Sequence, residues 1–227
     1  MTVQEKRTLI VQISDEGIET ILGQNQKVTI VRSFPDSAEY CVVCASFAPD
    51  PAFPPYSVIF YPNWKVLAFP KSIDAFETLD SEAGAGADAV TGNNYVFTGT
   101  GFVSGTKNDI GVIGIENQSK SSTSLTAALG QEISIPGGDI KTNPVAVAAI
   151  ISNNTFYFDP PDKIIVFTST QMEDGTILPA SLLQEKETLV RLPAGLMISR
   201  YLEIQLSNDC TTIHYDNKSH LFFTGEL

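Results

Sequence analysis

The amino-acid sequence predicts an all-β protein made of two tandem, related β-sandwich domains of the jelly-roll or immunoglobulin-like kind, with one or two short helices. Short runs of β-branched and aromatic residues alternate with turns, and the 227 residues include 16 Gly and 13 Pro, which is typical of β-rich folds. A hydrophobic fraction of 43% beside a charged fraction of 18% indicates a folded chain rather than a disordered or coiled-coil one. In addition, several motifs recur in the same order about one domain length apart.

The recurrence is clearest in the Leu-Gly-Gln motif of residues 22–24, which returns at residues 129–131. Further matches keep the same order: residues 9–13 with 112–115, 18–23 with 125–130, 41–45 with 145–151, 58–60 with 164–167, and 77–84 with 187–195. Any one match would occur by chance, and generic β composition is the alternative explanation, but the shared order favours a duplication. The sequence thus predicts a first domain over residues 1–106 and a second over residues 107–227.

The first elements follow from local signals. Residues 8–13 are apolar and β-branched and predict a strand, after which residues 14–23 supply a Ser N-cap, an amphipathic turn and a closing Gly, which predicts a short helix. Residues 28–34 and 38–47 predict the next two strands. The loop at residues 48–55 contains four prolines and is expected to be rigid.

Three further elements complete the first half. Residues 56–69 alternate around a turn at Pro62 and Asn63, which predicts a hairpin. Residues 72–79 place apolar side chains on one side and predict a short helix. Residues 83–92 are small and Gly-rich and predict a flexible loop.

The C-terminal part carries the clearest strand pattern of the chain. Alternation and turn residues predict a three-strand meander, with strands at residues 200–206, 210–215 and 220–223. The turns between them fall at Asn208 and Asp209 and at residues 216–219.

Composition and charge exclude several classes of function. The net charge of −12 and the pI of about 4.5 repel phosphate backbones, so we expect no nucleic-acid partner. The longest purely apolar run, residues 145–151, is far shorter than the roughly 20 residues of a membrane helix, so we expect no membrane span. The first thirteen residues carry Glu5, Lys6 and Arg7 rather than a continuous apolar run, so we expect no signal peptide. Three cysteines cannot all pair within one chain, which favours a reducing compartment, so we expect a cytoplasmic location.

Metal and redox sites are not expected. Cys41 and Cys44 form a C-x-x-C motif on a predicted strand, where residues three apart point to opposite faces. His214 and His220 lie in the predicted meander. A turn of two or four residues would pair Tyr215 with His220 and place the two imidazoles on opposite faces. A turn of three or five residues would place them on the same face. Since the chain also lacks nucleophile-elbow, Walker and dinucleotide motifs, we expect no catalytic residue, no metal and no cofactor.

Carboxylates and aromatic residues near the two Pro-rich loops are the candidate ligand contacts. Aspartate oxygens beside prolines offer acceptors to a sugar or a cation, and aromatic rings offer a platform for a ligand. Asp139 after two glycines is a further loop carboxylate. The alternatives are that Asp-Pro is a common turn former and that about half of the rings belong to the core. The predicted ligand-binding residues are Asp50, Tyr56, Tyr61, Trp64, Asp159 and Asp162.

The sequence therefore favours a non-catalytic binding or self-assembly protein of lectin-like type. Its expected partners are a carbohydrate or another small ligand and, because a duplicated chain often extends its symmetry, further copies of itself in a homo-oligomer. Two alternatives stay open. One is a carboxylate-dependent β-sandwich enzyme, a lyase or a glycosidase; the other is a toxin-like, membrane-active protein in which the Gly-rich residues 83–105 rearrange.

Overall fold

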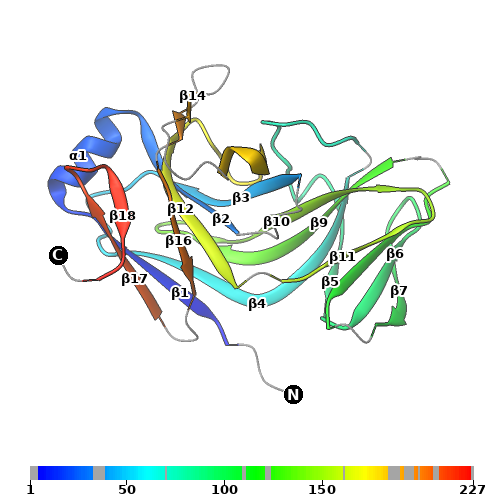
Figure 1. Cartoon of the computed structure of the whole chain (residues 1–227). Helices are drawn as coiled ribbons and strands as arrows, with labels where there is room; N and C mark the ends of the chain where they lie inside the picture. Colours follow the sequence, from blue (N-terminus) through cyan, green and yellow to red (C-terminus); the bar gives the residue numbers. More distant parts are fainter. Residues whose placement is uncertain are drawn as a thin grey trace.

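The computed structural model describes residues 5–32, 39–69, 71–108, 111–120, 124–160, 162–183, 190–191, 197–198, 200–206 and 210–225. Within these residues the chain forms eighteen strands, one α-helix and one short 3₁₀ helix, so the all-β class is confirmed. Figure 1 shows an elongated molecule, in which helix α1 (Asp15–Gly23) lies at one end and a small separate sheet lies at the other.

The first large sheet has seven strands, in the order β10-β9-β4-β1-β17-β18 with β5 beside β4. Its neighbours are antiparallel except for β1 and β17, which run parallel. The strands are β1 (Arg7–Gln12), β4 (Tyr56–Phe69), β5 (Ala85–Ala89), β9 (Ser124–Ser134), β10 (Ile140–Ile151), β17 (Cys210–Asp216) and β18 (Leu221–Phe223).

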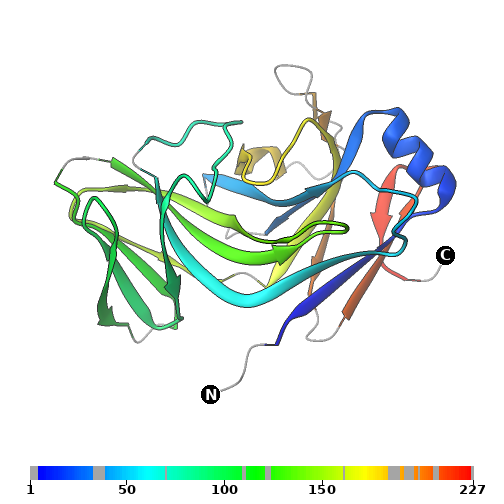
Figure 2. The ribbon, with the colours of Figure 1, turned by 180° about the vertical axis from the view of Figure 1, so that it is seen from behind.

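The second large sheet also has seven strands, in the order β13-β3-β2-β12-β15-β14 with β16 beside β12. These are β2 (Gln26–Arg32), β3 (Tyr40–Phe47), β12 (Lys163–Thr170), β13 (Ile177–Pro179), β14 (Val190–Arg191), β15 (Met197–Ile198) and β16 (Leu202–Gln205). A third sheet has the order β11-β8-β6-β7, with β6 (Asn93–Phe97), β7 (Phe102–Lys107), β8 (Ile113–Asn117) and β11 (Thr155–Phe158). Figure 2 shows the third sheet at the far end of the long strands β4, β9 and β10.

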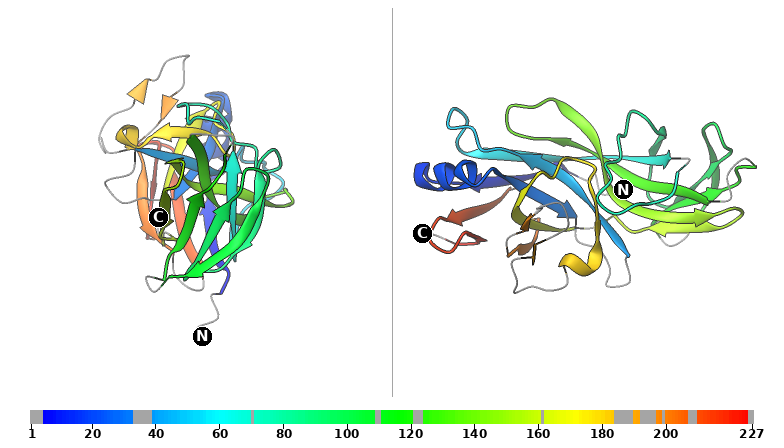
Figure 3. Two further views of the ribbon diagram at one scale, coloured as in Figure 1. Left: turned by 90° about the vertical axis from the view of Figure 1, so that its right-hand side faces the viewer. Right: turned by 90° about the horizontal axis from the view of Figure 1, so that it is seen from above.

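One continuous core joins the three sheets. Leu9 and Leu129 of the first sheet and Ile30 of the second belong to the same buried cluster, which also includes Ile113 and Phe158 of the third sheet. The view from above in Figure 3 shows why: β4, β9 and β10 extend from the sandwich into the far end. Their length lets one layer of apolar side chains serve all three sheets, since the side chains on one face of a strand form a continuous row.

The two predicted halves share both large sheets. β4 of the first half pairs with β9 of the second, β1 with β17, and β2 with β12. The predicted boundary at residue 106 falls inside β7. The prediction of two tandem sandwiches is therefore not confirmed, and backbone hydrogen bonds join the halves in each large sheet.

The Leu-Gly-Gln motifs occupy different structures. Leu22 and Gly23 close helix α1 (Asp15–Gly23), whereas Leu129 and Gly130 lie in the middle of strand β9. The interpretation of both motifs as the same joint is wrong. The reason is context: the first motif follows a capped helix, while the second is hydrogen-bonded between β4 and β10.

Helix α1 forms as the sequence predicts. The Ser14 hydroxyl accepts a hydrogen bond from the Gly17 amide at 3.2 Å, which satisfies one of the free N–H groups of the first turn. Ile18 and Ile21 are buried in the core. The second predicted helix is wrong: residues 72–79 form no helix, and Thr78 pairs instead with Thr176 through an isolated β-bridge.

Strand β4 replaces the predicted hairpin at residues 56–69. Residues 56–60 pair with β1, and β9 pairs with both parts of the strand, so the ladder resumes after an irregularity between Phe60 and Trp64. Pro62 therefore marks a bulge rather than a reversal of the chain. The loop predicted at residues 83–92 is also wrong in part, because β5 pairs with β4 across Leu67 and Gly86.

The predicted C-terminal meander is half right. β17 and β18 form the predicted hairpin, with Tyr215 opposite Phe222. β16 pairs with β12, and β17 pairs in parallel with β1, so the first strand of the meander is misplaced. His220 lies in the turn rather than opposite Tyr215; its Nδ1 is 3.3 Å from the Tyr215 hydroxyl, and the His214 ring stacks on Phe223.

Arg32 ties the two large sheets together inside the core. Its side chain is 1% exposed and donates a hydrogen bond to the Gln131 Oε1 atom of β9 at 2.6 Å. The guanidinium also lies 4.5 Å from the centroid of the Phe60 ring on β4. Burial lowers its pKa to about 10, so Arg32 remains charged at neutral pH. The hydrogen bond to Gln131 and the contact with Phe60 both join Arg32 of the second sheet to strands of the first sheet.

We expect only one of the three thiols to react in the native protein. Cys41 and Cys44 are buried on opposite faces of β3, and burial raises the pKa of each thiol to about 12, whereas Cys210 is exposed. A colorimetric thiol reagent near neutral pH should therefore label about one thiol rapidly, and three after unfolding. Rapid labelling of two or three thiols in the native protein would contradict the burial of the C-x-x-C motif.

Candidate functional site

The structure separates the two Pro-rich loops. Asp50 follows β3, whose end pairs with the start of β2. Asp159 and Asp162 precede β12, whose first residues pair with the end of β2. The loops therefore lie at opposite ends of the second sheet and do not form one paired site. Asp162 forms an ion pair with Arg7 at 2.5 Å.

The three aromatic residues of the predicted site belong mainly to the interior. Tyr56 is fully buried, and Trp64 is 7% exposed. The Tyr56 hydroxyl donates a hydrogen bond to the Asp50 carbonyl at 3.0 Å, which anchors the first loop to β4. Tyr61 is half-buried, and its backbone carbonyl accepts a hydrogen bond from Gln131 at 2.8 Å. These contacts are those of core and strand residues rather than of an exposed aromatic platform.

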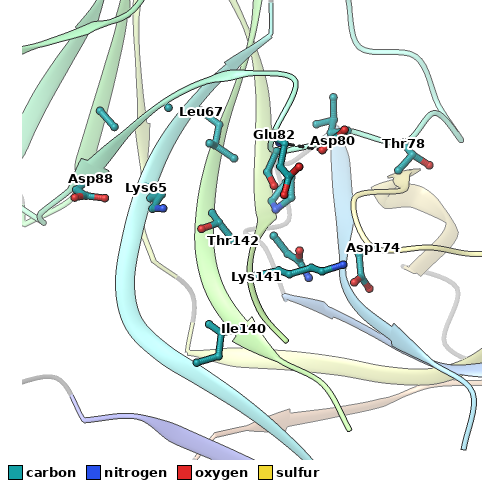
Figure 4. A pocket seen from close by; sticks show the side chains of 16 residues that line it. Lys65, Leu67, Thr78, Asp80, Glu82, Asp88, Ile140, Lys141, Thr142 and Asp174 are labelled. Carbon is teal, nitrogen blue, oxygen red and sulfur yellow. Dashed lines mark hydrogen bonds between the residues drawn. The ribbon is translucent and has the colours of Figure 1, made fainter. Parts of the chain in front are cut away.

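A polar cavity lies elsewhere, beside strands β4, β5 and β10. This first cavity has a volume of about 640 Å³ and is closed on one side by residues 78–82. Figure 4 shows charged side chains from separate segments of the chain around it. The charged residues that line it are Lys65, Asp80, Glu82, Asp88, Lys141 and Asp174.

Neutral hydrogen-bonding groups fill the gaps between these charges. Thr78, Ser81, Thr142 and Asn143 supply hydroxyl and amide groups, and none of the described residues that line the first cavity is aromatic. Carboxylates accept hydrogen bonds, ammonium groups donate them, and hydroxyls do both. The first cavity therefore suits a ligand with several hydroxyl or amino groups rather than an apolar one.

The wall at residues 78–82 is held by the turn that carries Asp174. The Gly175 carbonyl accepts a hydrogen bond from the Leu79 amide at 3.0 Å, and the Gly175 amide donates to the Val43 carbonyl at 2.7 Å. The Asp80 carboxylate accepts from the Glu82 amide at 2.9 Å, so the wall itself is a hydrogen-bonded turn. These contacts fix the wall relative to β3, although its own sequence forms neither helix nor strand.

Asp174 is the most unusual titratable group of the first cavity. Burial raises the pKa of its carboxyl group. Hydrogen bonds from the Ser46 amide and the Asn143 side chain and the charge of Lys141 lower this pKa, but burial has the larger effect. The Ser46 amide lies 2.6 Å from Oδ1. The Lys141 amino end points toward this carboxylate (Figure 4). A partly buried carboxylate in a cavity is a typical feature of a binding or catalytic site.

Asn143 connects Asp174 to the second sheet. Its side chain is 6% exposed and donates a hydrogen bond from Nδ2 to the Cys44 carbonyl at 2.9 Å. Asn143 lies on β10 of the first sheet, and Cys44 lies on β3 of the second. The base of the first cavity is therefore anchored to both sheets.

A second cavity of about 210 Å³ adjoins the first. Its lining includes Asp139, which the sequence singled out after Gly137 and Gly138. Lys141, Asn143 and Asp174 are common to both cavities.

Sequence reasoning missed most of this site. Asp80, Glu82 and Lys141 lie in stretches without any binding motif, and they meet only because the chain before β5 passes beside β10 of the same sheet. Glu173, Asp174 and Gly175 form an acidic turn between two strands, which is the one local signal that was available.

Comparison with protein families, with curated proteins and with solved structures found no match for this chain. Within the part of the chain that the structure describes, no three His, Cys, Asp or Glu side chains are grouped so as to hold a metal ion. Among the same residues, no helix is long and apolar enough to cross a membrane.

Proposed function

We propose that this protein is a non-catalytic binding protein whose ligand is a hydroxyl-rich molecule of carbohydrate type, held in the first cavity. The observation that carries the proposal is the polar lining of a cavity of about 640 Å³. This volume falls in the range of about 300 to 1,000 Å³ that is usual for small-molecule sites. The lectin-like expectation from the sequence is thereby moved from the Pro-rich loops to the junction of β4, β5 and β10.

The chemistry of the lining supports a sugar over other small ligands. Sugar hydroxyls donate to carboxylates such as Asp80 and Glu82 and accept from ammonium groups such as Lys65. Hydrogen bonds to charged groups contribute about 1.5–3 kcal/mol each, roughly twice the contribution of neutral ones. Several such bonds offset the cost of immobilising a small ligand.

The proposal is tested by a glycan array combined with a measurement of mass in solution. We expect binding of soluble hydroxyl-rich glycans with dissociation constants of about 10 µM to 1 mM, which corresponds to roughly 4–7 kcal/mol. The lining variant Lys65→Met should weaken this binding, whereas Lys218→Met, an exposed lysine of the turn after β17, should not. Absence of binding to every glycan would overturn the proposal.

The enzymatic alternative is favoured by one observation, the raised pKa of Asp174 inside the first cavity. A carboxyl group that is protonated at higher pH than usual suits a general acid, and Asp80 and Glu82 line the same space. Mass spectrometry of the glycans after incubation distinguishes the two functions. Cleavage that Asp174→Asn abolishes would replace the binding proposal with a glycosidase or a lyase.

Self-assembly is favoured by the edge of the third sheet. β11 ends the strand order of that sheet, and it exposes Phe156 and Tyr157 by 43% and 46%. An edge strand with exposed aromatic residues is a template for pairing with another chain. A dimer in the mass measurement that Phe156→Asp dissociates would support assembly through β11, and a monomer would remove it from the proposed function.

A further inference from the structure

The two cavities form one continuous polar surface. They share Lys141, Asn143 and Asp174, so a ligand that contacts Asp174 can reach into both. The first cavity continues toward Lys65 on β4, and the second continues toward the turn between β9 and β10. We call this surface the groove. Its shape favours a ligand made of several units over a single compact one.

An aromatic ring stands at the outer end of the groove. Phe53 is 51% exposed, and a Cβ atom built on Gly137, which lines the second cavity, would lie 3.6 Å from its ring. The loop that carries this ring is tightly turned, because the Phe53 amide donates to the Asp50 carbonyl at 3.0 Å and the Ala52 amide donates to the Asp50 carboxylate at 2.9 Å. Asp50, one of the ligand-binding residues predicted from the sequence, therefore positions the Phe53 ring.

The ring can contact a sugar unit or a cation at that end. Exposed aromatic faces in binding sites attract apolar C–H faces and positive charges. Since no aromatic residue lines the first cavity, Phe53 supplies the one such contact among the described residues of the groove and its rim.

The charge of the groove indicates the charge of the ligand. Its carboxylates are Asp80, Glu82, Asp88, Asp139 and Asp174, against the ammonium groups of Lys65 and Lys141. The whole chain carries a net charge of −12. Such a surface attracts a positively charged ligand and repels sulfated or uronic-acid glycans.

We propose that the groove binds an oligosaccharide of positively charged amino sugars, with central units at Asp174 and a terminal unit on Phe53. This inference rests on the proposed function and specifies its substrate class. The hydroxyl groups of such a ligand can form hydrogen bonds with the threonines and with Asn143. Its amino groups can pair with the excess carboxylates of the groove, and the face of a sugar ring can pack on Phe53. A basic peptide would satisfy only the carboxylates.

Isothermal titration calorimetry with glucosamine oligomers tests the proposal on the full chain. The probes are the monomer, dimer, trimer and tetramer of glucosamine, the N-acetylated tetramer, and tetralysine. We expect the affinity to rise about tenfold or more from monomer to tetramer as the second cavity is occupied. The neutral N-acetylated tetramer should bind about tenfold more weakly than the charged one, and added salt should weaken the charged one further.

Two variants locate the terminal unit. Phe53→Ala and Asp139→Asn should each reduce the ratio of tetramer to monomer affinity by about fivefold or more, because both side chains serve only the outer end of the groove. Leu22→Ala is the control, since Leu22 is another exposed large apolar residue but lies on helix α1. It should leave the ratio unchanged.

The outcomes separate this proposal from the proposed function. Equal affinities for monomer and tetramer, or for charged and acetylated tetramers, would overturn the oligomeric amino-sugar ligand while glycan binding stands. Tetralysine binding at least as tightly, with the same dependence on Phe53, would overturn it in favour of a basic peptide. Absence of binding to every glucosamine probe would overturn this proposal alone, whereas absence of binding to every glycan on the array would overturn both.

Discussion

Gly175→Ala is expected to destabilise the protein by about 2–4 kcal/mol, the sum of a strained backbone and a steric clash. Gly175 has a φ of +85°, and a Cβ atom there would lie 2.2 Å from the Leu79 carbonyl oxygen. The neighbouring segment cannot move away freely, because the Leu79 amide donates to the Gly175 carbonyl at 3.0 Å. The substitution therefore strains the turn and displaces the wall of the first cavity at once.

Thermal unfolding followed by circular dichroism measures this loss, which should lower the midpoint temperature by about 2–4 °C for each kcal/mol. Gly23→Ala is the matched control, because it lies at the end of α1 and a Cβ atom there meets nothing within 4 Å. It should leave stability unchanged or raise it by up to about 1 kcal/mol. Equal stabilities of Gly175→Ala and the unsubstituted protein would contradict the contact between the turn and the wall.

Asp174→Asn is expected to weaken ligand binding by about tenfold to a hundredfold without lowering the stability of the fold. The loss of affinity follows from removing a charged acceptor in a partly buried site, where such a hydrogen bond contributes about 1.5–3 kcal/mol. The asparagine keeps the shape of the side chain and can still accept the hydrogen bond from the Ser46 amide.

The stability expected of the Asp174→Asn variant follows from the direction in which burial shifts the pKa of Asp174. Because burial raises the pKa of Asp174 above that of the unfolded chain, its contribution to stability is greatest at low pH, when the carboxyl is protonated, and is lost as the pH rises through the raised pKa. Asparagine removes this cost of burying a charge at neutral pH. Ligand binding by the unsubstituted protein should weaken as the pH falls through the same range, and this dependence should be reduced in the variant.

Asp216→Asn is the matched control for Asp174→Asn. Asp216 is the last residue of β17, and hydrogen bonds from Ser219 and Lys218 lower its pKa, so its carboxylate stabilises the fold above the pKa of the unfolded chain. Its substitution should reduce stability slightly at neutral pH and leave binding unchanged. If Asp174→Asn instead lowered stability and affinity together, Asp174 would be a structural residue, and the first cavity would lose its proposed centre.

Local signals predicted several elements correctly. The N-cap at Ser14 and the acidic first turn suffice for α1, because capping and hydrophobic periodicity act within a few residues. The predicted turn at residues 216–219 and the flanking alternation indicate the β17–β18 hairpin for the same reason. In β3, the two-residue period correctly places Cys41 and Cys44 on opposite faces.

The predicted duplication is not confirmed, because the motifs that suggested it are local features, whereas strand pairing joins residues far apart in the sequence. A Leu-Gly-Gln motif can recur by chance, and similar apolar runs are typical of β-strands, so neither specifies a pairing partner. β1 joins β17 from the other end of the chain, and β16 joins β12 instead of β17. Such choices are decided by which apolar faces bury one another across the whole core, an effect that acts between residues far apart in sequence.

The sequence by itself determined the all-β class, the helix at residues 15–23, the terminal hairpin and an acidic surface, because each depends on composition or on neighbours a few residues away. Only the tertiary structure decided the sheet order and the groove. Lys65, Glu82, Lys141 and Asp174 are separated by up to about a hundred residues, and they line one cavity because long strands of one sheet and a glycine turn of the other bring them together. Proximity of this kind is set by packing, which no short stretch of sequence contains.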